Sequence, residues 1–167
     1  MRFSKILPLL GLLALCACYQ PLYGDKPLNG EPTEQEIKLN SVALGGVDGE
    51  NGQKLRNLLI DRMYGMGRPA KTDTRLEIEL KVTEEQYGLQ KNGITARARD
   101  IIVANFKLID GATHKELLAA TARSVVDFDI LDEQYATLNS REDAIRRGLT
   151  EVSDRIVKRL LLYFEKP

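Results

Sequence analysis

Two cysteines, Cys16 and Cys18, are the residues whose type and position most clearly indicate chemistry. They follow a short basic start and an apolar run, Ile6 to Leu15, which together have the layout of a bacterial secretion signal. The run has about 10 residues, half the length that a bilayer-spanning helix needs. We therefore expect a signal peptide that is cleaved, rather than a retained transmembrane anchor.

The spacing around these cysteines predicts cleavage before a cysteine and acylation of its thiol. The preferred pattern has Leu three positions before the modified cysteine and Ala or Gly directly before it, and Leu15 and Ala17 place Cys18 in that pattern. Cys16 directly follows Leu15, which is too bulky. Residues 1–17 are thus a predicted lipoprotein signal peptide, and Cys18 should carry a diacylglycerol on its thiol and a further chain, such as palmitate, on its amine. The alternative is a conventional signal in which both cysteines are merely small apolar residues.

The composition of the mature chain narrows its class. Removing 17 of 167 residues leaves 150, the size of one domain with its own core. Loss of Arg2 and Lys5 leaves 22 basic against 24 acidic residues, so no basic excess indicates nucleic-acid binding. Cys18 is the last cysteine, so the domain has no disulfide once that residue is acylated.

Candidate catalytic and metal-binding residues are few. The single histidine, His114, lies in a predicted turn, where we expect a solvated side chain rather than a catalytic one. Four acids, Glu84, Glu85, Asp127 and Asp129, form two pairs on predicted strands, where acids are usually solvated or bridged to Arg and Lys. No Cys/His cluster and no phosphate-binding glycine motif occurs. We expect neither an enzyme nor a metal or cofactor site.

Pattern and turn signals predict the elements that would position these residues. Residues 18–35 are proline-rich and without period, so they read as the acylated N-terminus and an extended tether, and 36–167 as a single domain. Expected in order are a strand at 37–44, a helix at 51–66, strands at 75–82, 94–110 and 116–130, and a helix that begins at a Ser140/Asp143 capping box and runs to Phe164.

Two local features of the strands complete this prediction. The apolar phase changes after Glu84, which predicts a β-bulge or bend there. Asn92-Gly93 predicts a tight turn. The predicted fold class is α+β, a two-layer sandwich of order β-α-β-β-β-α, in which a mostly antiparallel four-stranded sheet carries both helices on one face.

The polar face of that sheet is the candidate binding surface. Arg97, Arg99, Lys107 and Arg123 should share it with Glu77, Glu79 and Lys81. Guanidinium groups bind phosphate and carboxylate, so an anionic glycolipid or acidic partner loops could dock there. Ile101 and Val103 interrupt this face, which we interpret as partial coverage of a central strand on both sides. The alternative is a cross-strand ion-pair lattice that only solvates the sheet.

A family resemblance joins these observations. Cys18 followed by Gln20-Pro21-Leu22-Tyr23-Gly24 resembles the Cys-Gly-Phe-x-Pro-Leu-Tyr start of the LPS-assembly lipoprotein LptE family, in its alphaproteobacterial form. The element order and the closing helix are similar too, so the resemblance covers essentially the whole mature chain. Tyr19, where members often have Gly, is a departure. No lipopolysaccharide site of the family can be transferred residue by residue.

The resemblance implies a non-catalytic role in the cell envelope. It implies a complex with the outer-membrane β-barrel LptD, a place as plug in the barrel lumen, and a part in barrel assembly and in lipopolysaccharide delivery to the outer leaflet. Tyr19 is not the Asp that commonly retains lipoproteins at the inner membrane, which favours the periplasmic face of the outer membrane. Two alternatives stay open: an adaptor of a lipid-transport ABC system or peptidoglycan synthase, and a periplasmic enzyme that uses acids alone.

Overall fold

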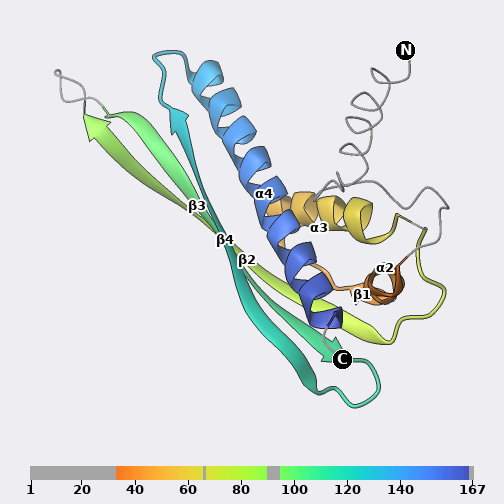
Figure 1. The fold of residues 1–167 in the computed structure, drawn as a ribbon. Helices are drawn as coiled ribbons and strands as arrows, with labels where there is room; N and C mark the ends of the chain where they lie inside the picture. The colour runs from red at the N-terminus through yellow and green to blue at the C-terminus, as the bar shows by residue number, and fades with distance from the viewer. Residues whose placement is uncertain (1–32, 66, 90–94, 166–167) are drawn as a thin grey trace, which may run out of the picture. The chain divides into compact units, whose positions relative to one another are not determined.

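The computed structural model describes residues 33–65, 67–89 and 95–165, within a compact unit from Thr33 to Pro167 (Figure 1). Its three helices and four strands are, in chain order, α2 (Glu34–Asn40), β1 (Val42–Leu44), α3 (Gly49–Met63), β2 (Thr74–Leu89), β3 (Thr95–Asp110), β4 (Glu116–Asp129) and α4 (Gln134–Phe164). The predicted signal peptide, Cys18 and the Asn92-Gly93 turn lie outside the described residues.

The four strands form one sheet in the order β1-β2-β3-β4. β2, β3 and β4 pair antiparallel over their length, as short connections require. β1 pairs parallel with β2, because the crossover through α3 returns the chain in the same direction. The sheet is therefore mixed but mostly antiparallel, and the predicted α+β class is confirmed.

The predicted strand at 37–44 is wrong in its first half, where the chain forms helix α2. Thr33 and Glu36 build a capping box: the Thr33 hydroxyl accepts from the Glu36 N–H at 3.3 Å, and the Glu36 carboxylate accepts from the Thr33 N–H at 2.9 Å. Leu39 turns into the core. This local capping overrides the loose alternation on which the strand prediction was based.

The predicted bulge near Glu84 is also wrong. β2 runs without interruption, and its pairing with β3 keeps one register from Thr74↔Asp110 to Tyr87↔Arg97. The apolar phase changes because Tyr87 belongs to the opposite face of the same regular strand. The irregular backbone of β2 is at Gly88, whose φ is +78°.

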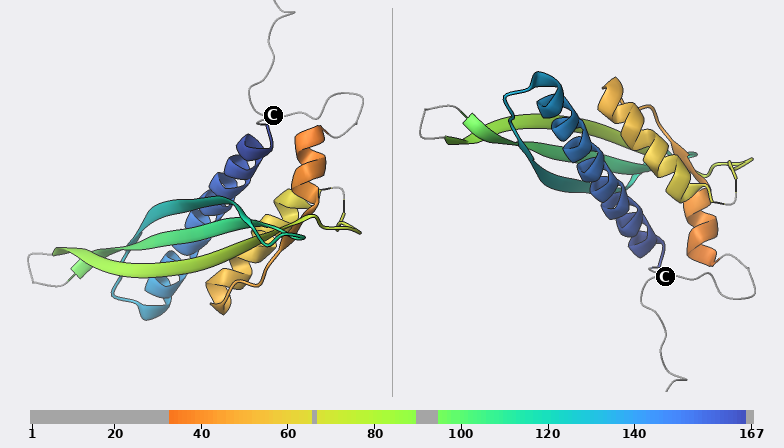
Figure 2. Two further views of the ribbon diagram at one scale, coloured as in Figure 1. Left: turned by 90° about the horizontal axis from the view of Figure 1, so that it is seen from below. Right: turned by 90° about the horizontal axis from the view of Figure 1, so that it is seen from above.

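The helices cover one face of this sheet, and the core lies between the two layers (Figure 2). Alternate strand residues point into it, among them Leu76, Ile102, Phe106 and Leu108. α4 contributes one apolar face to this core, with Ala144, Ile145, Leu149, Val152, Ile156 and Leu160 all buried. Gly148 lets this helix approach the sheet closely, since a Cβ there would lie 2.5 Å from Ile102 Cδ1.

The start of the closing helix differs from the prediction. α4 begins at Gln134, so Ser140 lies inside the helix and the predicted capping box does not exist. Asp143 instead accepts from Arg146 and Arg147 on the next turn. Thr137 bridges back to the preceding loop, accepting from the Leu131 N–H at 2.8 Å and donating to its carbonyl at 3.0 Å. Residues 134–139 contain neither Gly nor Pro, the two residues that disfavour a helix most strongly, and the helix extends through them toward β4.

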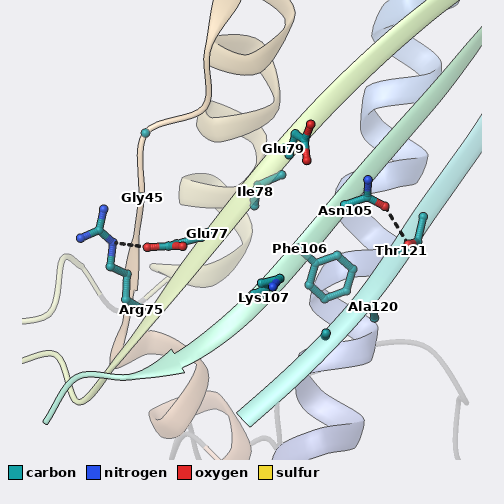
Figure 3. Close-up of a pocket in the computed structure, with 12 residues that line it drawn as sticks. Gly45, Arg75, Glu77, Ile78, Glu79, Asn105, Phe106, Lys107, Ala120 and Thr121 are labelled. Carbon is teal, nitrogen blue, oxygen red and sulfur yellow. Dashed lines mark hydrogen bonds and ion pairs between the residues drawn. The ribbon is translucent and has the colours of Figure 1, made fainter. Parts of the chain in front are cut away.

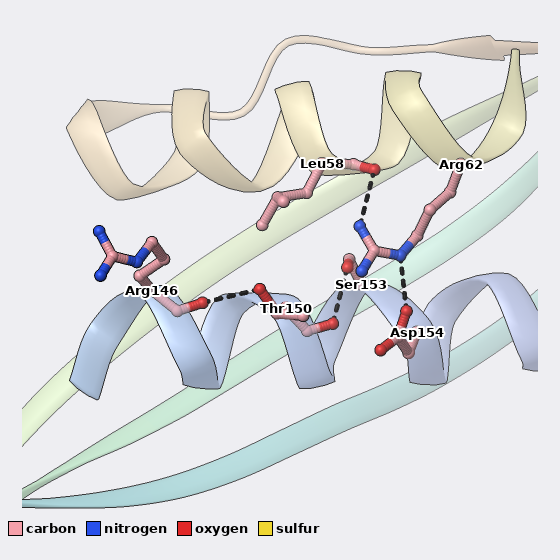
Figure 4. A network of polar contacts seen from close by, with 6 residues as sticks. All are labelled: Leu58, Arg62, Arg146, Thr150, Ser153 and Asp154. Atoms are coloured by element: carbon pink, nitrogen blue, oxygen red, sulfur yellow. Dashed lines mark hydrogen bonds and ion pairs between the residues drawn. The ribbon is translucent and has the colours of Figure 1, made fainter. Parts of the chain in front are cut away.

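A polar network joins α3 to α4 (Figure 4). Arg62 donates to Asp154 of α4 at 2.5 Å and to the Leu58 carbonyl of its own helix at 3.2 Å. Beside it, Ser153 donates to the Thr150 carbonyl at 2.7 Å. The Arg62–Asp154 contact connects the two helices. Among the described helices none has the length and apolar content to cross a membrane.

Candidate functional site

The face of the sheet opposite the helices is the predicted polar surface, and we call it the outer face (Figure 2). Strand alternation places all four predicted basic residues on it, since their neighbours along each strand are the buried ones. Its described members are Glu77, Glu79, Lys81, Thr83, Glu85 and Tyr87 of β2, Arg97, Arg99, Ile101, Val103, Asn105 and Lys107 of β3, and Ala119, Thr121, Arg123, Val125, Asp127 and Asp129 of β4.

Three of the predicted basic residues form an ion pair with an acidic residue of a neighbouring strand. Arg97 contacts Asp129 at 3.2 Å, Arg99 contacts Glu85 at 3.0 Å, and Lys107 contacts Glu116 at 2.9 Å. The Glu116 carboxylate raises the pKa of Lys107 through this hydrogen bond and its charge. These contacts are the cross-strand lattice that the sequence left open as an alternative.

The cations do not gather into one patch. Arg97 and Lys107 are ten residues apart on β3, which corresponds to about 33 Å along an extended strand. At the end near Arg97, Tyr87 joins the lattice: its hydroxyl donates to Asp127 at 2.7 Å, which raises the Tyr87 pKa, and Arg99 lies 5.1 Å from its ring centroid. Two arginines there face three carboxylates, so this end is not cationic.

The middle of the outer face has a different character. Lys81 and Arg123 flank Val103 on one rung, and the next rung places Ile101 beside Val125, which is 43% exposed. Neither cation has an ion-pair partner among the described contacts. Ile101 and Val103 lie on the interior strand β3 and are partly buried, as the interpretation of partial coverage expects, and no described helix or strand lies over them on this face. This band combines apolar surface with two available cations.

A shallow groove of about 700 Å³ follows on the same face toward β1 (Figure 3). It exists because β4 has small residues there, Ala119 and Thr121, and because Gly45 adds no side chain. The Thr121 hydroxyl donates to Asn105 at 2.8 Å. Charges around it are balanced, with Arg75, Lys107, Glu77 and Glu79 in the lining. The groove is open, and its lining combines charged residues with apolar ones such as Ile78 and Ala120, so it does not form an enclosed pocket for a small substrate.

The candidate catalytic acids are separated and engaged. Glu84 and Glu85 point to opposite faces of β2, as adjacent strand residues must. Glu85, Asp127 and Asp129 each contact the lattice described above. His114 is an exposed turn residue with φ +57°. Within the described ranges no group of three potential metal ligands forms.

The sequence patterns did not predict an ion pair on the inward side of the sheet. Asp100 on β3 is fully buried and accepts from Arg141 of α4 at 3.1 and 3.2 Å. Arg141 also contacts Glu84 at 3.0 Å and lies 5.9 Å from the Phe128 ring centroid. The hydrogen bonds to Asp100 raise the pKa of Arg141. The sequence did contain a signal, since Asp100 is an acid in the middle of the inward phase of β3, between Ala98 and Ile102.

Comparison with known families places this fold. The model of the LptE family, described as lipopolysaccharide-assembly, matches residues 39–160. That range is well over half of the chain. The protein belongs to the LptE family.

Solved structures of three lipoproteins have a similar fold. A Caulobacter crescentus CB15 protein described as a lipoprotein is 22% identical, with TM-score 0.64, over 81% of this chain and 99% of that chain. Lipoprotein B of Nitrosomonas europaea is 14% identical, with TM-score 0.57, over 75% and 84%. Rare lipoprotein B of Shewanella oneidensis is 18% identical, with TM-score 0.50, over 71% and 92%. Among the curated proteins no sequence matches.

The LptE match covers the four strands, α3 and most of α4. It begins at Leu39, before β1, and ends at Leu160 in the last turns of α4. The outer face and the Asp100–Arg141 pair therefore lie inside the family domain. Cys18 lies outside it.

Proposed function

We propose that this LptE-family member is an outer-membrane lipoprotein that binds a large β-barrel of the LptD type, as plug and assembly factor, in the transport of lipopolysaccharide to the cell surface. Acyl chains on Cys18 would anchor it at the periplasmic face. The observation that carries the proposal is the family match over residues 39–160. The role is one of binding and requires no catalytic group.

The surface chemistry supports this role. The lumen of a membrane β-barrel is polar. The outer face carries charged side chains of both signs in cross-strand ion pairs. The exposed sides of α3 and α4 add ion pairs such as Lys54–Glu50 and Arg155–Glu151. In a domain with such surfaces most charges of these ion pairs already have a partner, and the remaining cations can pair with acidic groups of a polar lumen.

Recovery from membranes tests the proposal. Full-length tagged protein, extracted from outer membrane with detergent, should copurify in equal amount with one large β-barrel, identified by mass spectrometry. Depletion of the protein should reduce lipopolysaccharide at the cell surface. Copurification of an inner-membrane transporter or a peptidoglycan synthase instead would show that the protein is an adaptor of another envelope machine. Tagged Cys18→Ala protein, secreted without acyl chains, separates barrel binding from membrane anchoring.

We further propose that the outer face binds the anionic part of lipopolysaccharide, through Arg97, Arg99, Lys107 and Arg123. We expect these residues to differ in how readily they bind an anion. Arg123 and Lys81 beside the apolar band are available at once, whereas Arg97, Arg99 and Lys107 must first exchange an acid for a phosphate. Exposed ion pairs contribute only about 0–1 kcal/mol, so such an exchange costs little.

Charge reversal measures this contribution. Arg123→Glu should weaken binding of purified lipopolysaccharide by about tenfold at low salt, and Arg97→Glu with Arg99→Glu by a smaller factor. The difference should shrink as salt screens the charges. Lys38→Glu with Lys54→Glu makes a matched control, since both residues are exposed on the helix side. Unchanged affinity in all outer-face variants would leave the lattice with a solvating role only.

A further inference from the structure

The free edge of β4 is a second interaction surface, distinct from the outer face. β4 is the last strand of the sheet, and β3 occupies one of its two edges. No described strand pairs with the other edge over its 14 residues. The backbone N–H and C=O groups on that edge can receive another strand, as in peptide recognition by strand addition.

One stripe of α4 runs along this edge. Glu151 marks its beginning, because its carboxylate accepts from the Ser124 hydroxyl of β4 at 2.7 Å. One to three turns further on, Arg155, Lys158, Arg159 and Leu162 line a groove with Phe106, Thr121 and Ala122. The groove has a volume of about 250 Å³. We call it the β4–α4 groove.

The groove is cationic on its helix side and apolar at its base. Phe106 is buried to 2% exposure beneath it, and Leu162 is 45% exposed beside it. Arg155 is held by Glu151 at 2.5 Å, and that carboxylate has its pKa lowered by the Ser124 hydroxyl and by Arg155. Lys158 and Arg159 are exposed and have no ion-pair partner among the described contacts. The edge strand therefore lies beside two available positive charges.

We propose that the β4–α4 groove receives an extended acidic segment of a partner protein, which adds to the sheet beside β4. Main-chain hydrogen bonds to β4 would hold the segment. Alternate side chains of the added strand point toward the helix layer, and acidic ones meet Lys158 and Arg159 there. The inference concerns this groove alone and holds whichever envelope machine supplies the segment.

Charge and hydrogen bonding together select this occupant. A second copy paired through β4 would bring a second set of Arg155, Lys158 and Arg159 to the same seam, and like charges disfavour it. An anionic lipid headgroup would neutralise the cations but would not use the strand edge. An acidic polypeptide in extended conformation satisfies both features.

A peptide-binding experiment tests the inference with full-length acylated protein in detergent micelles. The probe is a fluorescent peptide of alternating Thr and Glu, measured by fluorescence anisotropy. Lys158→Glu with Arg159→Glu should weaken binding at least tenfold. Arg146→Glu with Arg147→Glu, the same charge change on exposed positions of the same helix, should change it less than twofold. Circular dichroism confirms that both variants fold.

The backbone contribution is tested separately. A probe of equal charge with Pro at alternate positions cannot form a strand and should lose at least tenfold in affinity. Equal binding of the two probes would reduce the contact to charge alone and overturn the proposal. So would binding of phosphatidylglycerol vesicles that depends on Lys158 and Arg159 while the peptide does not bind. Concentration-dependent dimers that the double charge reversal disrupts or strengthens, without peptide binding, would also overturn it.

Discussion

Arg141→Ala should lower the free energy of unfolding by about 3–5 kcal/mol, because it leaves the carboxylate of Asp100 buried without a counter-charge. Asp100 has no exposed surface, and both of its described side-chain hydrogen bonds come from Arg141. Domains of this size are stable by only about 5–15 kcal/mol, so the loss is large. Urea unfolding followed by far-ultraviolet circular dichroism is the suitable measurement, since the chain has no Trp.

The reverse substitution should cost less. Asp100→Ala leaves Arg141 38% exposed and still in contact with Glu84, so its charge keeps water and a partner, and we expect a loss of about 1.5 kcal/mol. Replacing both Asp100 and Arg141 with Leu should recover most of the loss in Arg141→Ala. Arg97→Ala is the control, because its pair with Asp129 is exposed on both sides and should contribute at most about 1 kcal/mol. Equal losses for Arg97→Ala and Arg141→Ala would contradict the burial argument.

The Asp100–Arg141 ion pair could be predicted only in part from the sequence. The inward phase of β3 was predicted correctly from its alternation, and in that phase Asp100 stands out among Ala98, Ile102 and Ala104. Its partner could not be found in the same way, because Arg141 is 41 residues further on in another element. The predicted capping box at Ser140 also placed Arg141 at a frayed helix end, whereas it lies seven residues inside α4.

The fold class was easier to predict from the sequence than the ends of individual helices and strands. Period-two patterns in β2, β3 and β4 and the helical stripe of α4 fix which faces are buried, and two layers are the arrangement that covers them. The errors arose where a short-range hydrogen bond decides the conformation. Thr33 and Glu36 make a helix of residues that alternate weakly, and Thr137 supports a helix start that carries no N-cap bond.

For the outer face, the sequence predicted which residues lie on it but not which of them contact one another. Strand parity places Arg97, Arg99, Lys107 and Arg123 together on one side, and the structure agrees. The register between strands decides which acid each cation meets, and a shift by two residues would preserve the parity while exchanging every partner. The sequence therefore could not distinguish a cationic patch from an ion-pair lattice with an apolar centre.

Cys18→Ala should release the protein from membranes almost completely, and Cys16→Ala should not. Burial of each acyl CH₂ contributes about 0.8 kcal/mol, and one chain gives only marginal, reversible binding while several give stable anchoring. Carbonate washing of membranes, followed by immunoblotting of pellet and supernatant, measures the change.

The two cysteine variants also separate anchoring from function. If the domain acts by docking into a larger envelope protein, Cys18→Ala should still bind that partner in solution, because the outer face and the β4–α4 groove lie in the β-strands and α4 and not in the tether. Loss of activity in cells would then follow from lowered local concentration, and overproduction of Cys18→Ala should restore part of it. A Cys16→Ala protein that appears in the soluble fraction would instead assign the acylated thiol to Cys16 and shift the mature N-terminus by two residues.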